Sequence, residues 1–165
     1  MAFVSPSLSP PTAEASEAKL AELVRRSFGA ELALTAMPGG ASTRRYFRLT
    51  LPEGKTAVAM FVPEGGRPEE VQKQHDGAAR WPFLEVRDLL AEHGVDVPDI
   101  LAEDTAHGWL VIEDLGDETL ANWLLKHPGD REGLYRKAVR DLARAQNELA
   151  SLPEGCVVAS RTFDF

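Results

Sequence analysis

Two consecutive strand patterns joined by a short turn constrain the fold of this chain more than any other feature. In residues 44–51 the side chains alternate, and one face of the segment carries Arg45, Phe47, Leu49 and Leu51. Such a period of two predicts a strand with one face toward a core. After the turn Pro52–Lys55, residues 56–62 are apolar on both faces. A segment of this kind is typical of a central strand, so the chain is expected to build a covered sheet around it.

The order of helical and strand patterns predicts a mixed α+β fold. The predicted elements are a helix over 12–28 ended by Gly29, strands over 31–36, 44–51 and 56–62, a helix over 82–93 ended by Gly94, strands over 98–103 and 109–113, and helices over 117–127 and 130–150. Five strands with one intervening helix, followed only by helices, favour an α+β unit that passes into an α-helical unit. The predicted organisation is a loose tail over 1–11, a first unit over 12–115 and a helical unit over 116–165.

The sequence also predicts a core side for one helix, the N-caps of two helices and one loop. In the helix over 82–93 the expected core side carries Phe83, Val86, Leu89 and Leu90. Asp117 and Asp130 are predicted N-caps of the last two helices, since a carboxylate there accepts from free N–H groups. The polar, Gly-rich segment Pro63–Gly77 is predicted to be a mobile loop.

Composition excludes several classes of function. With 18 basic and 26 acidic residues the net charge is −8, and no dense Lys/Arg run occurs, so a nucleic-acid partner is not expected. The one cysteine, Cys156, cannot form an internal disulfide, which favours a cytoplasmic location. No apolar run approaches the ~20 residues of a membrane span, and the first residues do not resemble a signal peptide. The four histidines are scattered, so no metal site is expected from them.

The stretch from Met37 to Thr50 places Gly39, Gly40 and two small hydroxyl residues ahead of an arginine-rich strand. It is compatible with a loop that holds phosphate, because glycines let backbone N–H groups approach an anion. It is equally compatible with a plain turn between two strands. A glycine pair alone does not decide between these alternatives.

Four segments carry a resemblance to a known family. They are GGASTRRYFRL (39–49), AVAMFVP (57–63), VDVPDILAED (95–104) and GWLVIEDLGDETL (108–120). In their order and amino-acid sequence these segments resemble the aminoglycoside phosphotransferase-like kinases. Within that family they are most similar to the bacterial sugar kinases that phosphorylate N-acetylmuramate and N-acetylglucosamine at the anomeric position. The resemblance covers nearly all of Leu20–Phe165. It implies a protein-kinase-like small lobe, a five-stranded antiparallel sheet plus helix, followed by the first helices of an α-helical lobe.

The resemblance implies two contact regions for a nucleotide, ATP or another nucleoside triphosphate with Mg²⁺. The phosphate region would consist of Gly39, Gly40, Ala41, Ser42, Thr43 and Arg45. The second region would be the strand end Ile112, Glu113, Asp114 and Leu115, whose backbone groups would contact the adenine edge. The alternatives are solvated strand charges for the arginines and a strand end with two exposed acids for the second region.

The chain departs from the general kinase pattern on its third strand. Many kinases of this fold hold the α and β phosphates with a lysine there. Met60 or Phe61 occupies that place, and the sugar-kinase branch that the chain resembles also lacks the lysine. Glu85 is the candidate for the helix glutamate that pairs with it. Because Glu85 lies off the apolar stripe, near Asp88 and Glu92, a solvated face is the favoured interpretation.

The catalytic stretch of the family, H-x-D-x-x-x-x-N, does not occur in the sequence. Asp117 and Asn122 have the D-x-x-x-x-N spacing without the histidine, and Asp117 suits a helix N-cap better. The resemblance therefore implies a catalytic Asp and metal ligands beyond Phe165, and no catalytic or metal-binding residue in this chain.

Two classes of function follow from this comparison with the family. The first is an ATP-dependent phosphotransferase that acts on a small hydroxyl acceptor such as an amino sugar, present here as its nucleotide-binding half and expected to be inactive alone. The second is a non-catalytic nucleotide-binding or regulatory module of the same fold. An unrelated α+β domain is the remaining alternative.

Overall fold

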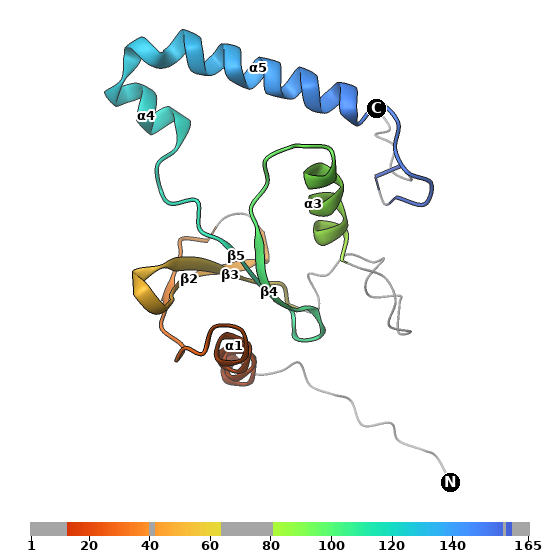
Figure 1. The fold of residues 1–165 in the computed structure, drawn as a ribbon. Coiled ribbons are helices and arrows are strands. Elements are labelled where there is room, and N and C mark those ends of the chain that lie inside the picture. Colours follow the sequence, from red (N-terminus) through yellow and green to blue (C-terminus); the bar gives the residue numbers. More distant parts are fainter. Residues whose placement is uncertain (1–12, 40–41, 64–80, 157, 160–165) are drawn as a thin grey trace. The chain divides into compact units, whose positions relative to one another are not determined.

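The computed structural model describes residues 13–39, 42–63, 81–156 and 158–159. The chain divides into two compact units, one of residues 1–72 and 99–114 and one of residues 73–98 and 115–165. Unit 1 contains α1 (Ala13–Phe28), β1 (Leu34–Ala36), β2 (Arg45–Thr50), η1 (Pro52–Gly54), β3 (Thr56–Phe61), β4 (Ile100–Asp104), η3 (Thr105–His107) and β5 (Trp109–Glu113) (Figure 1). Unit 2 contains α3 (Pro82–Glu92), α4 (Leu120–Lys126), η4 (Pro128–Asp130) and α5 (Arg131–Glu148).

The five strands of unit 1 form one antiparallel sheet in the order β1-β2-β3-β5-β4. This confirms the predicted α+β class with its five-stranded sheet. The first strand is shorter than the predicted 31–36, because the ladder with β2 begins at Leu34, opposite Leu49. The central strand β3 is buried at five of its six residues, as its two-sided apolar pattern predicts.

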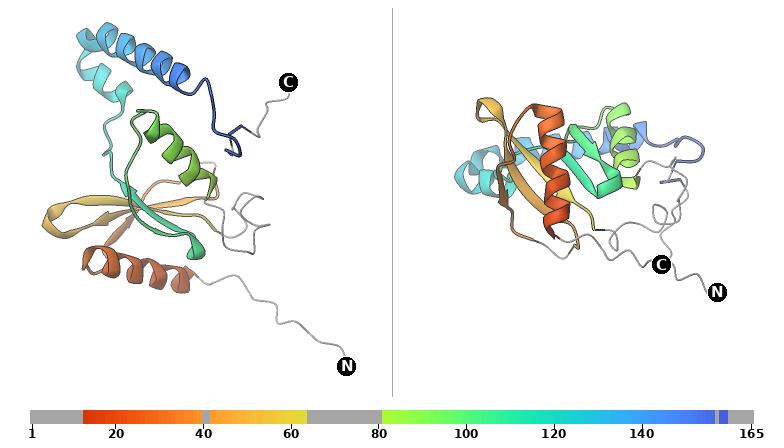
Figure 2. Two further views of the ribbon diagram at one scale, coloured as in Figure 1. Left: turned by 45° about the vertical axis from the view of Figure 1, so that its right-hand side comes forward. Right: turned by 90° about the horizontal axis from the view of Figure 1, so that it is seen from below.

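The main core of unit 1 lies between α1 and one face of the sheet, and Figure 2 shows α1 running along that face. Leu20, Leu23 and Val24 form the buried apolar face of α1. Their burial explains why α1 forms, since most helical stability in proteins comes from packing of an apolar face. The indole N–H of Trp109 donates to the carbonyl of Ser16 at 2.9 Å. The buried members of the core are Leu20, Leu23, Val24, Leu49, Ala57, Ala59, Phe61, Trp109 and Val111.

The side chains of β2 alternate between the two sheet faces as predicted, with Phe47 and Leu49 on the core side. Phe47 and Leu49 pack against the core under α1, and Arg45 on the same side lies with its guanidinium 4.9 Å from the centre of the Phe61 ring. Tyr46 and Arg48 therefore belong to the opposite face of the sheet. On that face their cross-strand partners are Met60 and Val58 of β3.

The helices of unit 2 correct two sequence predictions. The most buried residues of α3 are Leu84 and Leu89, whereas the predicted core residues Phe83, Val86 and Leu90 are only half-buried. The N-cap of α4 is Thr119, whose hydroxyl accepts from the Asn122 N–H, and not Asp117. A hydroxyl and a carboxylate are about equally good caps, so composition alone could not choose between the two positions.

Asp130 precedes α5 as predicted, but its carboxylate does not cap that helix. It accepts instead from the indole N–H of Trp123 at 2.9 Å, and the Trp123 ring stacks on His127 with centroids 4.0 Å apart. On α5 the large apolar side chains of Tyr135, Val139 and Leu142 are in residues that are more than half exposed in the described part of the chain. The predicted loop over 63–77 lies, apart from Pro63, outside the described residues. Within the described part, no helix combines the length and apolar character needed to cross a membrane.

The contribution of the α1 core can be tested with two leucine truncations. Leu23 is 1% exposed in the core, whereas Leu125 in α4 is 82% exposed. We expect Leu23→Ala to lower the free energy of unfolding by about 2–5 kcal/mol, because it removes buried methyl groups and leaves a cavity. Leu125→Ala should change it by less than about 0.5 kcal/mol. Urea denaturation followed by circular dichroism measures both, and equal effects would contradict the described core.

Candidate functional site

The Gly-rich turn predicted to hold phosphate connects β1 to β2. The hairpin closes where the Met37 N–H donates to the Tyr46 carbonyl at 3.0 Å. Beyond this pair, the Ser42 hydroxyl oxygen accepts from the Arg44 N–H at 3.2 Å and keeps its own proton for another acceptor. A Cβ added to Gly39 would meet nothing within 4 Å. Gly40 and Ala41 lie outside the described residues, and Thr43 is exposed.

Arg45, the arginine predicted to reach phosphate, starts β2 on the same side as Phe47 and Leu49. Its guanidinium lies over the Phe61 ring, an arrangement in which a cation is attracted by the negative face of the aromatic system. Arg45 would therefore reach a phosphate on the other face only after leaving this ring.

The predicted adenine-contacting segment is the end of β5. The ladder between β3 and β5 ends at the pair Ala57 and Glu113. The Glu113 N–H donates to the Asp99 carbonyl at 2.8 Å, and the Asp99 N–H donates to the Glu113 carboxylate at 3.2 Å. The Glu113 amide is thus already used on the β4 side. Three residues after Glu113 the chain turns at Gly116, where φ is +77°, a value that favours glycine.

An ion pair that the sequence analysis did not predict joins β2 to the residue after β5. The Arg48 Nε lies 2.7 Å from Asp114 Oδ2, and an Arg48 terminal nitrogen lies 3.2 Å from Asp114 Oδ1. Two parallel N–H···O bonds of this kind fix both direction and distance. The Asp114 side chain is 5% exposed and that of Arg48 is 28% exposed. The two residues are 66 positions apart, and the only sequence signal was the placement of Arg48 on the face opposite Phe47 and Leu49.

The sheet face opposite α1 brings these parts together. Arg48, Val58 and Ile112 stand in one cross-strand row, so a charged group lies beside an apolar floor. The Gly-rich turn adjoins the end of the sheet at which Arg45, Phe61 and Trp109 stand in one cross-strand row, and Phe61 and Trp109 of this row belong to the core under α1. Asp114 follows the other end of β5. Since β5 has five residues, the two ends are about 17 Å apart, the scale of an extended nucleoside triphosphate.

The phosphate-binding charge of the general kinase pattern is absent from β3. Met60 and Phe61, which occupy its place, are 1% and 7% exposed. In the described ranges, no group of three or more His, Cys, Asp or Glu side chains is arranged to hold a metal ion.

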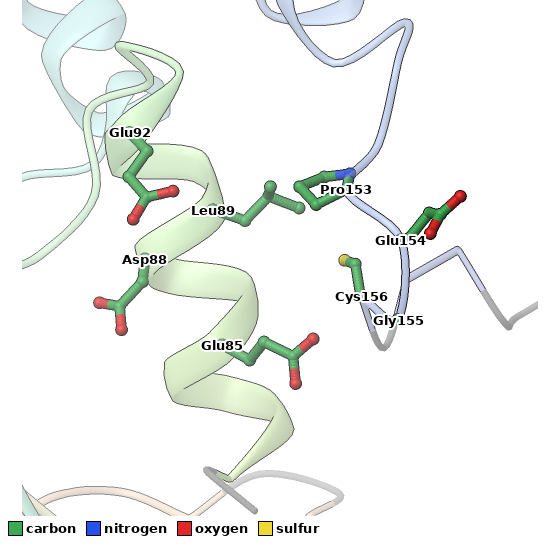
Figure 3. A pocket seen from close by; sticks show the side chains of 8 residues that line it. All are labelled: Glu85, Asp88, Leu89, Glu92, Pro153, Glu154, Gly155 and Cys156. Atoms are coloured by element: carbon green, nitrogen blue, oxygen red, sulfur yellow. The ribbon is translucent and has the colours of Figure 1, made fainter.

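Glu85, the candidate partner of that missing lysine, lies in unit 2. It is half-buried, more than a fully solvated face would be, and lines a cavity of about 310 Å³ between α3 and residues 153–156. Figure 3 shows Leu89 pointing toward Pro153 across this cavity, with the Cys156 thiol turned toward α3. The cavity belongs to unit 2 and not to the sheet face.

Comparison with known proteins assigns the chain to a family. Residues 33–161 match the phosphotransferase enzyme family (APH). The chain belongs to this family. The match includes all five strands and all of α5, so family membership rests on the whole sheet and not on the Gly-rich turn alone.

Several relatives of this phosphotransferase-family chain share the name N-acetylmuramate/N-acetylglucosamine kinase. The protein from Pseudomonas aeruginosa is 38% identical over 106 residues, 64% of this chain and 27% of the relative. The protein from Neisseria meningitidis is 31% identical over 68% of this chain and 30% of its own length. The protein from Caulobacter vibrioides is 30% identical over 79% of this chain and 40% of its own length. The chain thus matches well under half the length of these relatives.

The Arg48–Asp114 pair is expected to matter for the stability of the sheet. Asp114→Ala leaves the Arg48 charge partly buried without its partner, so we expect a loss of about 2–4 kcal/mol in the free energy of unfolding. Lys55→Gln provides the control, because the Lys55–Glu53 pair of unit 1 is more than 70% exposed on both sides and should contribute under about 1 kcal/mol. Denaturant titration measures both variants. Equal losses would show that burial of the Arg48–Asp114 pair is unimportant.

Proposed function

We propose that this chain forms the nucleotide-binding part of an ATP-dependent kinase that transfers the γ-phosphate to a hydroxyl group of an amino sugar. The observation that carries the proposal is the family match over residues 33–161, which includes both the Gly-rich turn and the end of β5. The arrangement of these two places at opposite ends of one sheet face supports it. Phosphoryl transfer depends above all on positioning and on charge stabilisation, which a sheet with a Gly-rich turn at one end can provide.

In this proposal the base lies at the end of β5. The half-buried Ile112 and the nearly buried Val58 offer an apolar surface to one face of the ring. The backbone between Ile112 and Leu115 contacts the edge of the base. Because the Glu113 N–H already donates to Asp99, we assign the donor to the adenine ring to the backbone after Glu113.

The phosphates lie at the Gly-rich turn. Backbone N–H groups of residues 39–43 and the hydroxyls of Ser42 and Thr43 are the donors in this assignment. The Ser42 oxygen is held by the Arg44 N–H, which leaves the hydroxyl proton free to point at an anion. Arg45 contributes if its guanidinium leaves the Phe61 ring. In this proposal the residues that would bind the Mg²⁺ expected with ATP lie beyond Phe165.

The acceptor is proposed from the relatives, which are named as kinases of N-acetylmuramate and N-acetylglucosamine. The chain contains no H-x-D-x-x-x-x-N stretch. We therefore propose that residues 1–165 alone bind nucleotide without transferring phosphate, because no general base or complete set of metal ligands is available.

Nucleotide binding through the turn can be tested by Gly39→Ala. The fold should tolerate the change, because the added methyl group meets nothing within 4 Å in this structure. A phosphate close to the backbone would meet that methyl group, so we expect ATP affinity to fall about tenfold, which corresponds to about 1.4 kcal/mol. Isothermal titration calorimetry with MgATP measures this. Gly129→Ala in η4, also without a neighbour within 4 Å, is the control and should bind like the unchanged chain. Unchanged affinity in a folded Gly39→Ala chain would rule out the turn as the phosphate site.

The acceptor can be tested with the product of the complete coding sequence. We expect phosphate transfer from MgATP to N-acetylmuramate or N-acetylglucosamine, detected by mass spectrometry. The methyl glycoside of N-acetylglucosamine, whose anomeric oxygen is blocked, should not be phosphorylated if the resemblance to anomeric kinases holds. Transfer to the glycoside would contradict the anomeric position. Binding of ATP without transfer to any sugar would favour the non-catalytic module.

A further inference from the structure

The ion pair between Arg48 and Asp114 lies directly after the end of β5, where the ladder between β3 and β5 stops. Pairing between β3 and β5 ends at Glu113, and the turn at Gly116 follows after only two residues. Of these two, Leu115 is 70% exposed as a whole residue, whereas the side chain of Asp114 is only 5% exposed and accepts two hydrogen bonds from Arg48. One side-chain restraint on this stretch therefore comes from β2, which lies on the other side of the central strand β3.

The geometry of the pair is suited to fix position and not only to neutralise charge. The guanidinium plane and the carboxylate plane meet through two atoms each, which restrains rotation about the axis between them. Arg48 sits in the middle of β2, with its backbone in the six-residue ladder to β3, so the restraint starts from a rigid element. Since Asp114 is nearly excluded from water, screening by solvent and salt is weaker than at an exposed pair.

We propose that Arg48 and Asp114 act as a positioning pair, which holds the backbone from Asp114 to Gly116 in the orientation that contacts the nucleotide base. This inference rests on the proposed nucleotide site and assigns a role to two side chains that need not contact the base themselves. Backbone groups distinguish adenine from guanine only if their donors and acceptors stay fixed in direction. The pair therefore sets base preference through the geometry of the backbone.

The first test measures whether the pair fixes the segment. Backbone ¹⁵N relaxation gives order parameters for single amides, and about 0.85 is typical of rigid backbone and under 0.6 of flexible backbone. We expect the amides of Asp114, Leu115 and Gly116 to be rigid in the unchanged chain. Arg48→Lys keeps the charge but loses the planar guanidinium group that donates two hydrogen bonds, and Asp114→Asn is nearly isosteric. In both variants the order parameters of the Asp114, Leu115 and Gly116 amides should fall to below about 0.6, while those of the β3 amides stay the same. Lys55→Gln at the exposed pair is the control and should leave them unchanged.

The second test measures whether this matters for the base. Calorimetry with MgATP and MgGTP gives the preference for adenine in each variant at a temperature where the variant is folded. We expect Arg48→Lys and Asp114→Asn to weaken ATP binding about tenfold and GTP binding less, so that the preference narrows. Lys55→Gln should keep both affinities. If one variant does not fold, the other decides.

The outcomes separate this inference from the proposed function. If the unchanged chain binds ATP and both folded variants keep rigid amides at residues 114–116, the positioning role is wrong and the proposed function stands. If these amides become flexible and base preference stays the same, the pair is structural only and the inference is also overturned. If the unchanged chain binds neither nucleotide, the proposed function fails and the inference fails with it.

Discussion

The packing of α1 against one face of the sheet determines which surface of unit 1 can serve a ligand. Leu20, Leu23 and Val24 are buried on that face, and the Trp109 indole N–H donates to the Ser16 carbonyl, which links the helix to β5. The opposite face, where Arg48 stands in one cross-strand row with Val58 and Ile112, is therefore the one on which we propose that the base binds. The alternation of β2 thus sends its core residues and its ion-pairing arginine to different sides, and one shift of register would exchange them.

Much of the sheet was predictable because its signals are local. The period of two in β2 fixed which residues face the core, and the two-sided apolar pattern of β3 identified the central strand. Gly29 and Gly94 end their helices with φ values of +62° and +69°, as their positions after the apolar stripes predict. The two candidate contact regions, the Gly-rich turn and the end of β5, were predicted from the similarity of these segments to the family. The pairing of the strands shows that the two regions lie near opposite ends of β5.

What the sequence did not reveal depends on partners distant along the chain. Arg48 and Asp114 are 66 residues apart, so no spacing rule could pair them, and Arg45 was the more conspicuous candidate because it follows the Gly-rich turn directly. The burial of Leu84 instead of Phe83 and Val86 reflects what packs on α3, which helical periodicity alone leaves ambiguous by one position. At the start of α4, Asp117 and Thr119 are both residue types that can cap a helix, and in the structure Thr119 is the N-cap.

The hydrogen bond between Ser16 and Trp109 also has a consequence for biosynthesis. Its two ends are 93 residues apart, and α1 is made long before β5 exists. At translation rates of about 5–20 residues per second, the apolar stripe of α1 waits about 5–20 s for the floor on which it packs. During that interval the nascent chain presents Leu20, Leu23 and Val24 to solvent or to a chaperone, so α1 is synthesised before the strands of unit 1 but is buried only after β5 has been made.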